Sequence, residues 1–151
     1  MKVAVIGSNG QLGTDVVHAF ADNGDEVCGL THADVEIANR GSVSNKLREL
    51  QADIVVNTAA MHHVENCESE PDRAFAVNAL GSKNLALVAR DIGSVLMHVS
   101  TDYVFDGSKG SPYDEGDPPT KCSSDRPVSA TWFGNCRPNR PCESRHSARY
   151  D

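Results

Sequence analysis

The stretch that decides the fold is Val3-Ala4-Val5-Ile6-Gly7-Ser8-Asn9-Gly10-Gln11-Leu12-Gly13. Its first four residues are apolar and predict a buried strand, and the apolar residues that recur after Gly13 at helical spacing predict a helix. Between them, Gly7, Gly10 and Gly13 stand three positions apart. In such a turn one glycine makes the tight bend, another lets the backbone approach a pyrophosphate, and the third allows close helix packing. The stretch therefore predicts a dinucleotide-binding unit; a turn without a ligand is the alternative.

The same alternation of strand and helix continues to about residue 100. Further strands are expected at 26–30, 53–57 and 94–99, with a short extended piece at 35–37, and helices are expected at 42–50 and 71–91. Continuous apolar strands that alternate with helices are typical of a parallel sheet covered on both faces. The fold class is therefore α/β, a doubly wound Rossmann-like domain over residues 1–120.

The composition changes after Thr120. Residues 122–151 contain no Leu, Ile or Met, and Pro127, Pro138 and Pro141 oppose a helix there. Such a segment buries too little apolar surface to offset its ordering entropy. We expect residues 121–151 to be an irregular, disordered tail, and the abrupt change indicates a frame change or an altered gene end.

Charge and apolar runs exclude several classes of function. The formal net charge is −7, from 21 acidic and 14 basic residues, so a nucleic-acid partner is not expected. No apolar stretch approaches the roughly 20 residues that span a bilayer, and no export signal is visible, so we expect a cytoplasmic protein without membrane contact.

The cysteines and histidines predict neither a disulfide framework nor a metal site. Five cysteines are an odd number in a chain without an export signal. The tail cysteines lack the paired Cys-x-x-Cys spacing of structural zinc sites, and the adjacent His62 and His63 are expected to diverge.

The end of the second strand leaves the choice of cofactor open. It reads Gly29-Leu30-Thr31-His32, with neither the acid that commonly binds the ribose of NAD nor an Arg for the phosphate of NADP. The third strand ends in the small residues Asn57-Thr58-Ala59-Ala60-Met61, as expected where the backbone approaches a nucleotide; tight strand–helix packing is the alternative.

Four motifs together resemble the dTDP-4-dehydrorhamnose reductase family of extended short-chain dehydrogenase/reductases. The resemblance covers residues 1 to about 119. The motifs, in family order, are Gly7-Ser8-Asn9-Gly10-Gln11-Leu12-Gly13, Asn57-Thr58-Ala59-Ala60, Ala74-Phe75-Ala76-Val77-Asn78 and Ser100-Thr101-Asp102-Tyr103-Val104-Phe105-Asp106-Gly107.

The resemblance implies hydride transfer from NADPH or NADH to the C4 ketone of a nucleotide sugar, dTDP-4-dehydro-L-rhamnose. Thr101 matches the family's catalytic hydroxyl, and Asp102 and Tyr103 match positions that line the sugar pocket. A homodimer is left open. The cofactor-binding residues implied are Gly7, Asn9, Gly10, Gln11, Leu12, Gly13, Ala59, Ala60 and Asn78.

The resemblance stops short of the family's acid catalyst, Tyr-x-x-x-Lys. Tyr103 and Tyr113 are followed four residues on by Gly107 and Asp117, and Tyr150 stands next to the last residue. We therefore expect a truncated reductase with little activity, whose strand at 94–99 exposes an edge. The alternatives are a non-catalytic NAD(P)-binding or regulatory subunit, and another sugar-nucleotide epimerase or dehydratase.

Overall fold

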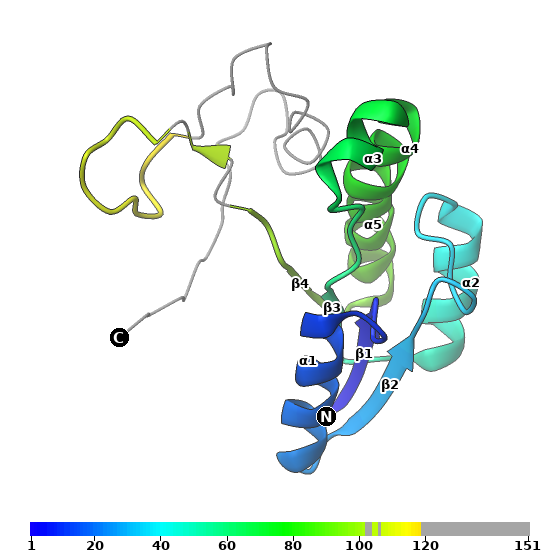
Figure 1. Cartoon of the computed structure of the whole chain (residues 1–151). Helices are drawn as coiled ribbons and strands as arrows, with labels where there is room; N and C mark the ends of the chain where they lie inside the picture. The colour runs from blue at the N-terminus through cyan, green and yellow to red at the C-terminus, as the bar shows by residue number, and fades with distance from the viewer. Residues whose placement is uncertain (102–103, 106, 119–151) are drawn as a thin grey trace.

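A parallel sheet of four strands forms the centre of the computed structural model, which describes residues 1–101, 104, 105 and 107–118. The strands lie in the order β2-β1-β3-β4, so the chain moves to one side of β1 first and to the other side afterwards (Figure 1). The predicted doubly wound parallel sheet is therefore confirmed. The strands are β1 (Lys2–Ile6), β2 (Glu26–Leu30), β3 (Ile54–Asn57) and β4 (Val95–His98).

Helices cover the two faces of the sheet unequally. On one face, α1 (Gln11–Asp22) packs on β1 and β2 and closes a small core around Val3, Val5 and Val56. On the other face lie α2 (Arg40–Leu50) and α5 (Ser82–Ile92), which bury the larger core (Figure 1). Its most buried members are Ala4, Ile6, Val43, Leu47, Val55, Leu85 and Val88.

The predicted helix over 71–91 is present but is not a regular α-helix throughout. It begins as α4 (Pro71–Phe75), widens into a π-helix, η1 (Ala76–Gly81), and continues as α5 to Gly93, whose φ of +79° ends it. Segments of π-helix occur frequently at functional sites. The sequence does not signal this widening, because the apolar spacing reads as helical in either form.

Two short segments differ from the expectation. The helix α3 (Val64–Ser69) was not predicted, since six residues give too few turns for a periodic pattern. The extended piece expected at 35–37 is wrong, because residues 35 and 36 have no regular structure and Ile37 begins a turn. Val35 and Ile37 are nevertheless buried on either side of Glu36, and this alternation imitates a strand.

The strand β4 lies at the edge of the described sheet, as expected. Val95 and Met97 pair in register with Ile54 and Val56, which places them on the face that α1 covers over β1 and β2. Their exposed fractions are 64% and 53%, and that of Val99 is 44%. Within the described part of the chain, this half of the sheet therefore presents apolar surface.

The described residues test only in part the expectations about the tail, the cysteines and membrane-spanning segments. The tail expected over 121–151 lies outside the described residues. Cys28 and Cys67 are both free thiols. Among the described residues, none of the helices has the length and apolar character that crossing a membrane requires.

Because Leu85 is fully buried in the larger core, we expect Leu85→Ala to lower the free energy of unfolding by about 2–5 kcal/mol. Urea titration followed by circular dichroism measures the change. Leu80→Ala is the matched control, since Leu80 is 41% exposed in the adjoining helical turn, and its loss should stay below about 1 kcal/mol. Equal losses in the two variants would contradict the assignment of the core.

Candidate functional site

The turn from β1 into α1 has no room for side chains at two of its glycines. Gly7 has φ +80°, and a Cβ there would lie 2.9 Å from the backbone nitrogen of Ala59. A Cβ on Gly13 would lie 2.1 Å from the carbonyl oxygen of Gly7. Contacts below 3.0 Å with backbone atoms cannot be relieved by a side-chain shift. Packing thus requires glycine at both positions, and at Gly7 the positive φ favours it as well.

Hydrogen bonds fix this turn between the ends of β2 and β3. The amides of Gly7 and Ser8 donate to the Leu30 carbonyl at 2.8 and 3.2 Å. From the other side, the Thr58 hydroxyl lies 2.8 Å from the Ile6 carbonyl oxygen and 3.3 Å from that of Gly7. The turn therefore lies where the strand order changes direction. In open α/β sheets ligands bind at this switch point.

A pocket of about 690 Å³ opens at this carboxyl edge of the sheet. Its walls are the glycine turn, the end of β2, the segment 58–62 after β3, and one face of α4 and η1. Eight of the nine predicted cofactor-binding residues line it. They are Gly7, Asn9, Gly10, Gln11, Leu12, Gly13, Ala59 and Ala60.

The N-terminus of α1 faces this pocket without a counter-charge of its own. The helix begins at Gln11, no side chain caps it, and its first turn contains no acidic residue. The partial positive charge of a helix N-terminus and its unpaired amides favour an anion such as a phosphate. An anionic group in the pocket would therefore be stabilised beside the glycine turn.

The ninth predicted residue, Asn78, supports the wall of the pocket rather than lining it. Its side-chain oxygen accepts from the Met61 amide at 2.8 Å, and its nitrogen donates to the Met61 carbonyl at 2.9 Å. The thiol of Cys67 contacts the same carbonyl at 3.3 Å, and burial raises the pKa of this thiol. Asn78 is 5% exposed, so its visible role is to hold the segment after β3 in place.

The predicted catalytic residue Thr101 comes shortly after β4. Val99 still donates to the Asn57 carbonyl at 3.2 Å, so the chain leaves the sheet just before Thr101, at the same carboxyl edge as the glycine turn. Thr101 does not line the pocket. The predicted substrate-binding residues Asp102 and Tyr103 lie outside the described residues.

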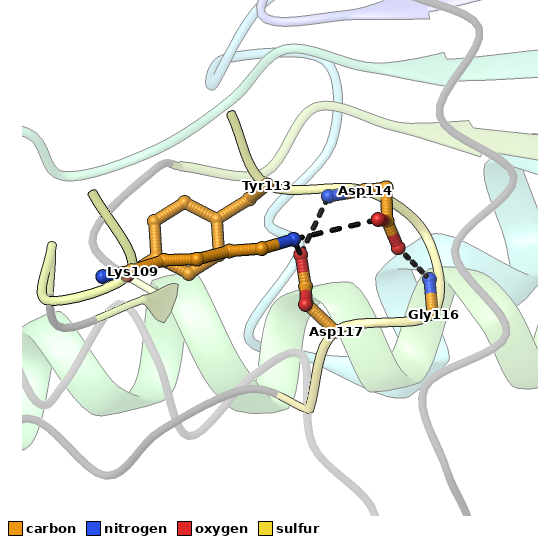
Figure 2. Close-up of polar contacts among 5 residues, drawn as sticks. All are labelled: Lys109, Tyr113, Asp114, Gly116 and Asp117. Carbon is orange, nitrogen blue, oxygen red and sulfur yellow. Dashed lines mark hydrogen bonds and ion pairs between the residues drawn. The ribbon is translucent and has the colours of Figure 1, made fainter. Parts of the chain in front are cut away.

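The segment that follows is organised by contacts within itself (Figure 2). The Lys109 ammonium pairs with the carboxylates of Asp117 and Asp114, and the ring of Phe105 stacks on Tyr113 with centroids 4.2 Å apart. The hydrogen bond to Asp117 raises the pKa of Lys109, and the same bond lowers the pKa of Asp117. One ammonium is thus shared by two carboxylates within this segment.

The sequence analysis did not identify the polar residues that follow β2 as part of the pocket. Thr31, His32 and Glu36 line the pocket. Asp34 accepts from the Thr31 amide at 2.8 Å and from the Thr31 hydroxyl at 2.7 Å. Both bonds lower the pKa of Asp34, and the bond from the hydroxyl has the larger effect. The expectation that no acid belongs to this strand end is therefore incomplete. Its signal was the position of Asp34, about 20 residues after Gly13.

No cluster of three or more His, Cys, Asp or Glu side chains that could hold a metal ion occurs among the residues that the structure describes. The expectation that the side chains of His62 and His63 diverge is wrong, because their rings contact one another with centroids 4.3 Å apart.

The chain is similar in sequence to several known proteins. The chain is 43% identical over 117 residues to the spore coat polysaccharide biosynthesis protein SpsK of Bacillus subtilis, covering 78% of this chain and 41% of the relative. It is 42% identical over 117 residues to a dTDP-4-dehydrorhamnose reductase of Sinorhizobium fredii, covering 78% and 39%. The chain thus spans about two fifths of the length of these relatives.

A solved structure shares the fold. The dTDP-4-dehydrorhamnose reductase of Bacillus anthracis, crystallised in complex with NADP, matches with a TM-score of 0.79 and 28% identity over 88% of this chain and 47% of that one. The RmlD substrate binding domain family model matches residues 1–124. The resemblance predicted from the four motifs is therefore confirmed, and the chain belongs to the RmlD substrate binding domain family, together with the dTDP-4-dehydrorhamnose reductases.

Proposed function

We propose that this chain binds NADPH or NADH in the pocket between the glycine turn and the ends of β2 and β3. The observation that carries the proposal is the absence of space for a Cβ at Gly7 and Gly13, combined with the uncapped N-terminus of α1. A pyrophosphate needs such close approach to backbone amides. The turn residues Asn9 and Gly10, with Gln11 at the start of α1, would hold it, and Ala59 and Ala60 would let the rest of the dinucleotide lie against β3.

We propose further that the chain belongs to an enzyme that reduces the C4 ketone of dTDP-4-dehydro-L-rhamnose to the alcohol of dTDP-L-rhamnose. The names of the relatives support this substrate class. The nicotinamide, when bound, supplies the hydride. Thr101 follows β4 in the chain, and we propose that its hydroxyl donates a hydrogen bond to the carbonyl oxygen as negative charge develops on it. Asp102 and Tyr103 are proposed to contact the sugar.

Proton supply limits what these 151 residues can do alone. Reduction of a ketone leaves an alkoxide that must be protonated, and a positioned general acid typically contributes about 10²–10⁴-fold to such a step. No Tyr in the sequence is followed four residues later by Lys. We therefore propose that the chain by itself binds cofactor and reduces substrate slowly.

The same sequence fact favours a second candidate function, a non-catalytic NAD(P)-binding subunit. Its cofactor site would be as described, but its task would be to regulate or support a partner enzyme. Affinity purification of the tagged chain from its native cell separates the two candidates. One stoichiometric partner enzyme supports a regulatory subunit, and recovery of the chain without a partner supports the reductase assignment.

We also propose that the protein acts in the cytoplasm as a homodimer and that residues 1–120 form the NAD(P)-binding unit. The free thiols of Cys28 and Cys67 are typical of a reducing compartment. Val95 and Met97 offer an apolar surface beside the β4 edge for a second copy. Light scattering coupled to gel filtration tests the dimer.

We expect the purified chain to bind NADPH or NADH with a dissociation constant between about 1 µM and 1 mM. Calorimetry measures binding, and the same preparation is assayed for reduction of dTDP-4-dehydro-L-rhamnose. Turnover should be at least about 100-fold below that of a family member that contains Tyr-x-x-x-Lys. Absence of binding would overturn the proposed function, and turnover at the full rate would show that another residue supplies the proton.

We expect Gly13→Ala to weaken dinucleotide binding by at least about tenfold, because the added methyl meets the Gly7 carbonyl and pushes the turn away from α1. Titration of nicotinamide fluorescence measures this. Gly41→Ala is the matched control, since a Cβ there meets only the end of the Asn39 side chain at 3.2 Å. Circular dichroism shows whether each variant folds. Unchanged binding in a folded Gly13→Ala variant would exclude the glycine turn as the site.

A further inference from the structure

We propose that the end of β2 makes this site select NADH over NADPH, and that Thr31, Asp34 and Glu36 determine the selection. The inference rests on the dinucleotide binding proposed above. The two cofactors differ by a phosphate on the 2′-oxygen of the adenosine ribose. In this type of fold that oxygen is recognised at the end of the second strand. The selection is therefore decided by what this strand end offers to a hydroxyl or to a phosphate.

The strand end is tied directly to the glycine turn. The Leu30 carbonyl, the last of β2, accepts from the amides of Gly7 and Ser8. Thr31 and His32 follow immediately and line the same pocket as Gly7 and Gly10. A dinucleotide whose pyrophosphate lies on the turn thus has its adenosine ribose close to Thr31. Asp34 and Glu36 belong to the turn that leaves this strand end.

The hydroxyl proton of Thr31 already takes part in a hydrogen bond. The hydroxyl donates to a carboxylate oxygen of Asp34 at 2.7 Å, and the Thr31 amide donates to the same oxygen at 2.8 Å. A hydroxyl has one proton to donate and two lone pairs. The Ala33 amide donates to the Thr31 oxygen at 3.3 Å, so what remains there is the capacity to accept one further hydrogen bond. A ribose 2′-hydroxyl can donate to it, whereas a phosphate, which offers only acceptor oxygens, cannot.

The charges at this strand end also oppose a phosphate. The Asp34 carboxylate binds the Thr31 hydroxyl, and one Glu36 carboxylate oxygen lies 3.4 Å from the His32 imidazole. The other Glu36 oxygen accepts from the Ala38 amide at 2.9 Å, which holds the carboxylate in place. The imidazole is thus already beside a carboxylate. A phosphate here would be placed next to two negative groups.

The nearby cations already form ion pairs with other carboxylates. The Lys46 ammonium lowers the pKa of Asp34 less than the two hydrogen bonds from Thr31 do, and it pairs with Glu49 at 3.4 Å. Among the described residues that line the pocket, the only Arg or Lys is Arg73, which comes from α4 and pairs with Glu70 at 3.1 Å. The strand end therefore lacks the arginine that usually accepts the 2′-phosphate of NADP.

The test compares the dissociation constants of the full 151-residue chain for NADH and NADPH, by nicotinamide fluorescence and by calorimetry with ADP-ribose and its 2′-phosphate. We expect the forms with a free 2′-hydroxyl to bind at least about tenfold more tightly. Asp34→Asn and Glu36→Gln retain shape and remove charge, and each should tighten NADPH binding by at least about threefold while changing NADH binding little. Thr31→Val should weaken NADH binding by about threefold to tenfold and spare NADPH.

Asp22→Asn is the matched control, because it removes the same charge at the far end of α1, roughly 16 Å along the helix from Gln11. It should leave the ratio of the two constants unchanged. Equal or tighter binding of NADPH by the unmodified chain would overturn the inference and leave the proposed function standing. A preference for NADH that none of the three variants alters would remove these residues as its cause. Failure of both dinucleotides to bind would overturn the proposed function and the inference together.

Discussion

The structure depends on close contact between the glycine turn and its backbone neighbours. The start of α1 lies against the Gly7 carbonyl with no space for a Cβ at Gly13, and Gly7 lies against Ala59 with no space for its own. These contacts set how near α1 and the end of β3 can approach β1. A helix displaced by one methyl group would open the turn and move the unpaired amides of the helix away from the pocket.

Polar groups connect this turn to the rest of the carboxyl edge. The Leu30 carbonyl holds the turn from β2, and the Thr58 hydroxyl holds it from β3. The buried amide of Asn57 continues the connection, since its side-chain nitrogen donates to Nδ1 of His98 on β4 at 3.0 Å and its side-chain oxygen accepts from the Ala59 amide at 3.1 Å. Buried polar groups are stable only when they are paired. Here the pairing also aligns the ends of all four strands.

The pairing of buried polar groups also explains the position of Asn78. The motif around it was interpreted as part of the cofactor site, yet its two hydrogen bonds go to the backbone of Met61, and its own carbonyl accepts from the Ser82 hydroxyl at 2.8 Å. It therefore joins η1 to the wall of the pocket. A residue that supports a site in this way appears in a motif as readily as one that contacts the ligand, because loss of either disturbs the same geometry.

The sequence by itself determined the parallel α/β fold, the strand positions, the glycine turn and eight of the residues that line the pocket, because strand and helix periodicity and glycine spacing are local properties. Only the tertiary structure decided what depends on contacts between distant segments. It engaged Asn78 with Met61, which lies 17 residues away in sequence. It also folded the turn after β2 so that Asp34 binds Thr31, and it left the β4 face beyond α1 exposed among the described residues. Such features depend on packing and hydrogen bonding in three dimensions, which no local pattern records.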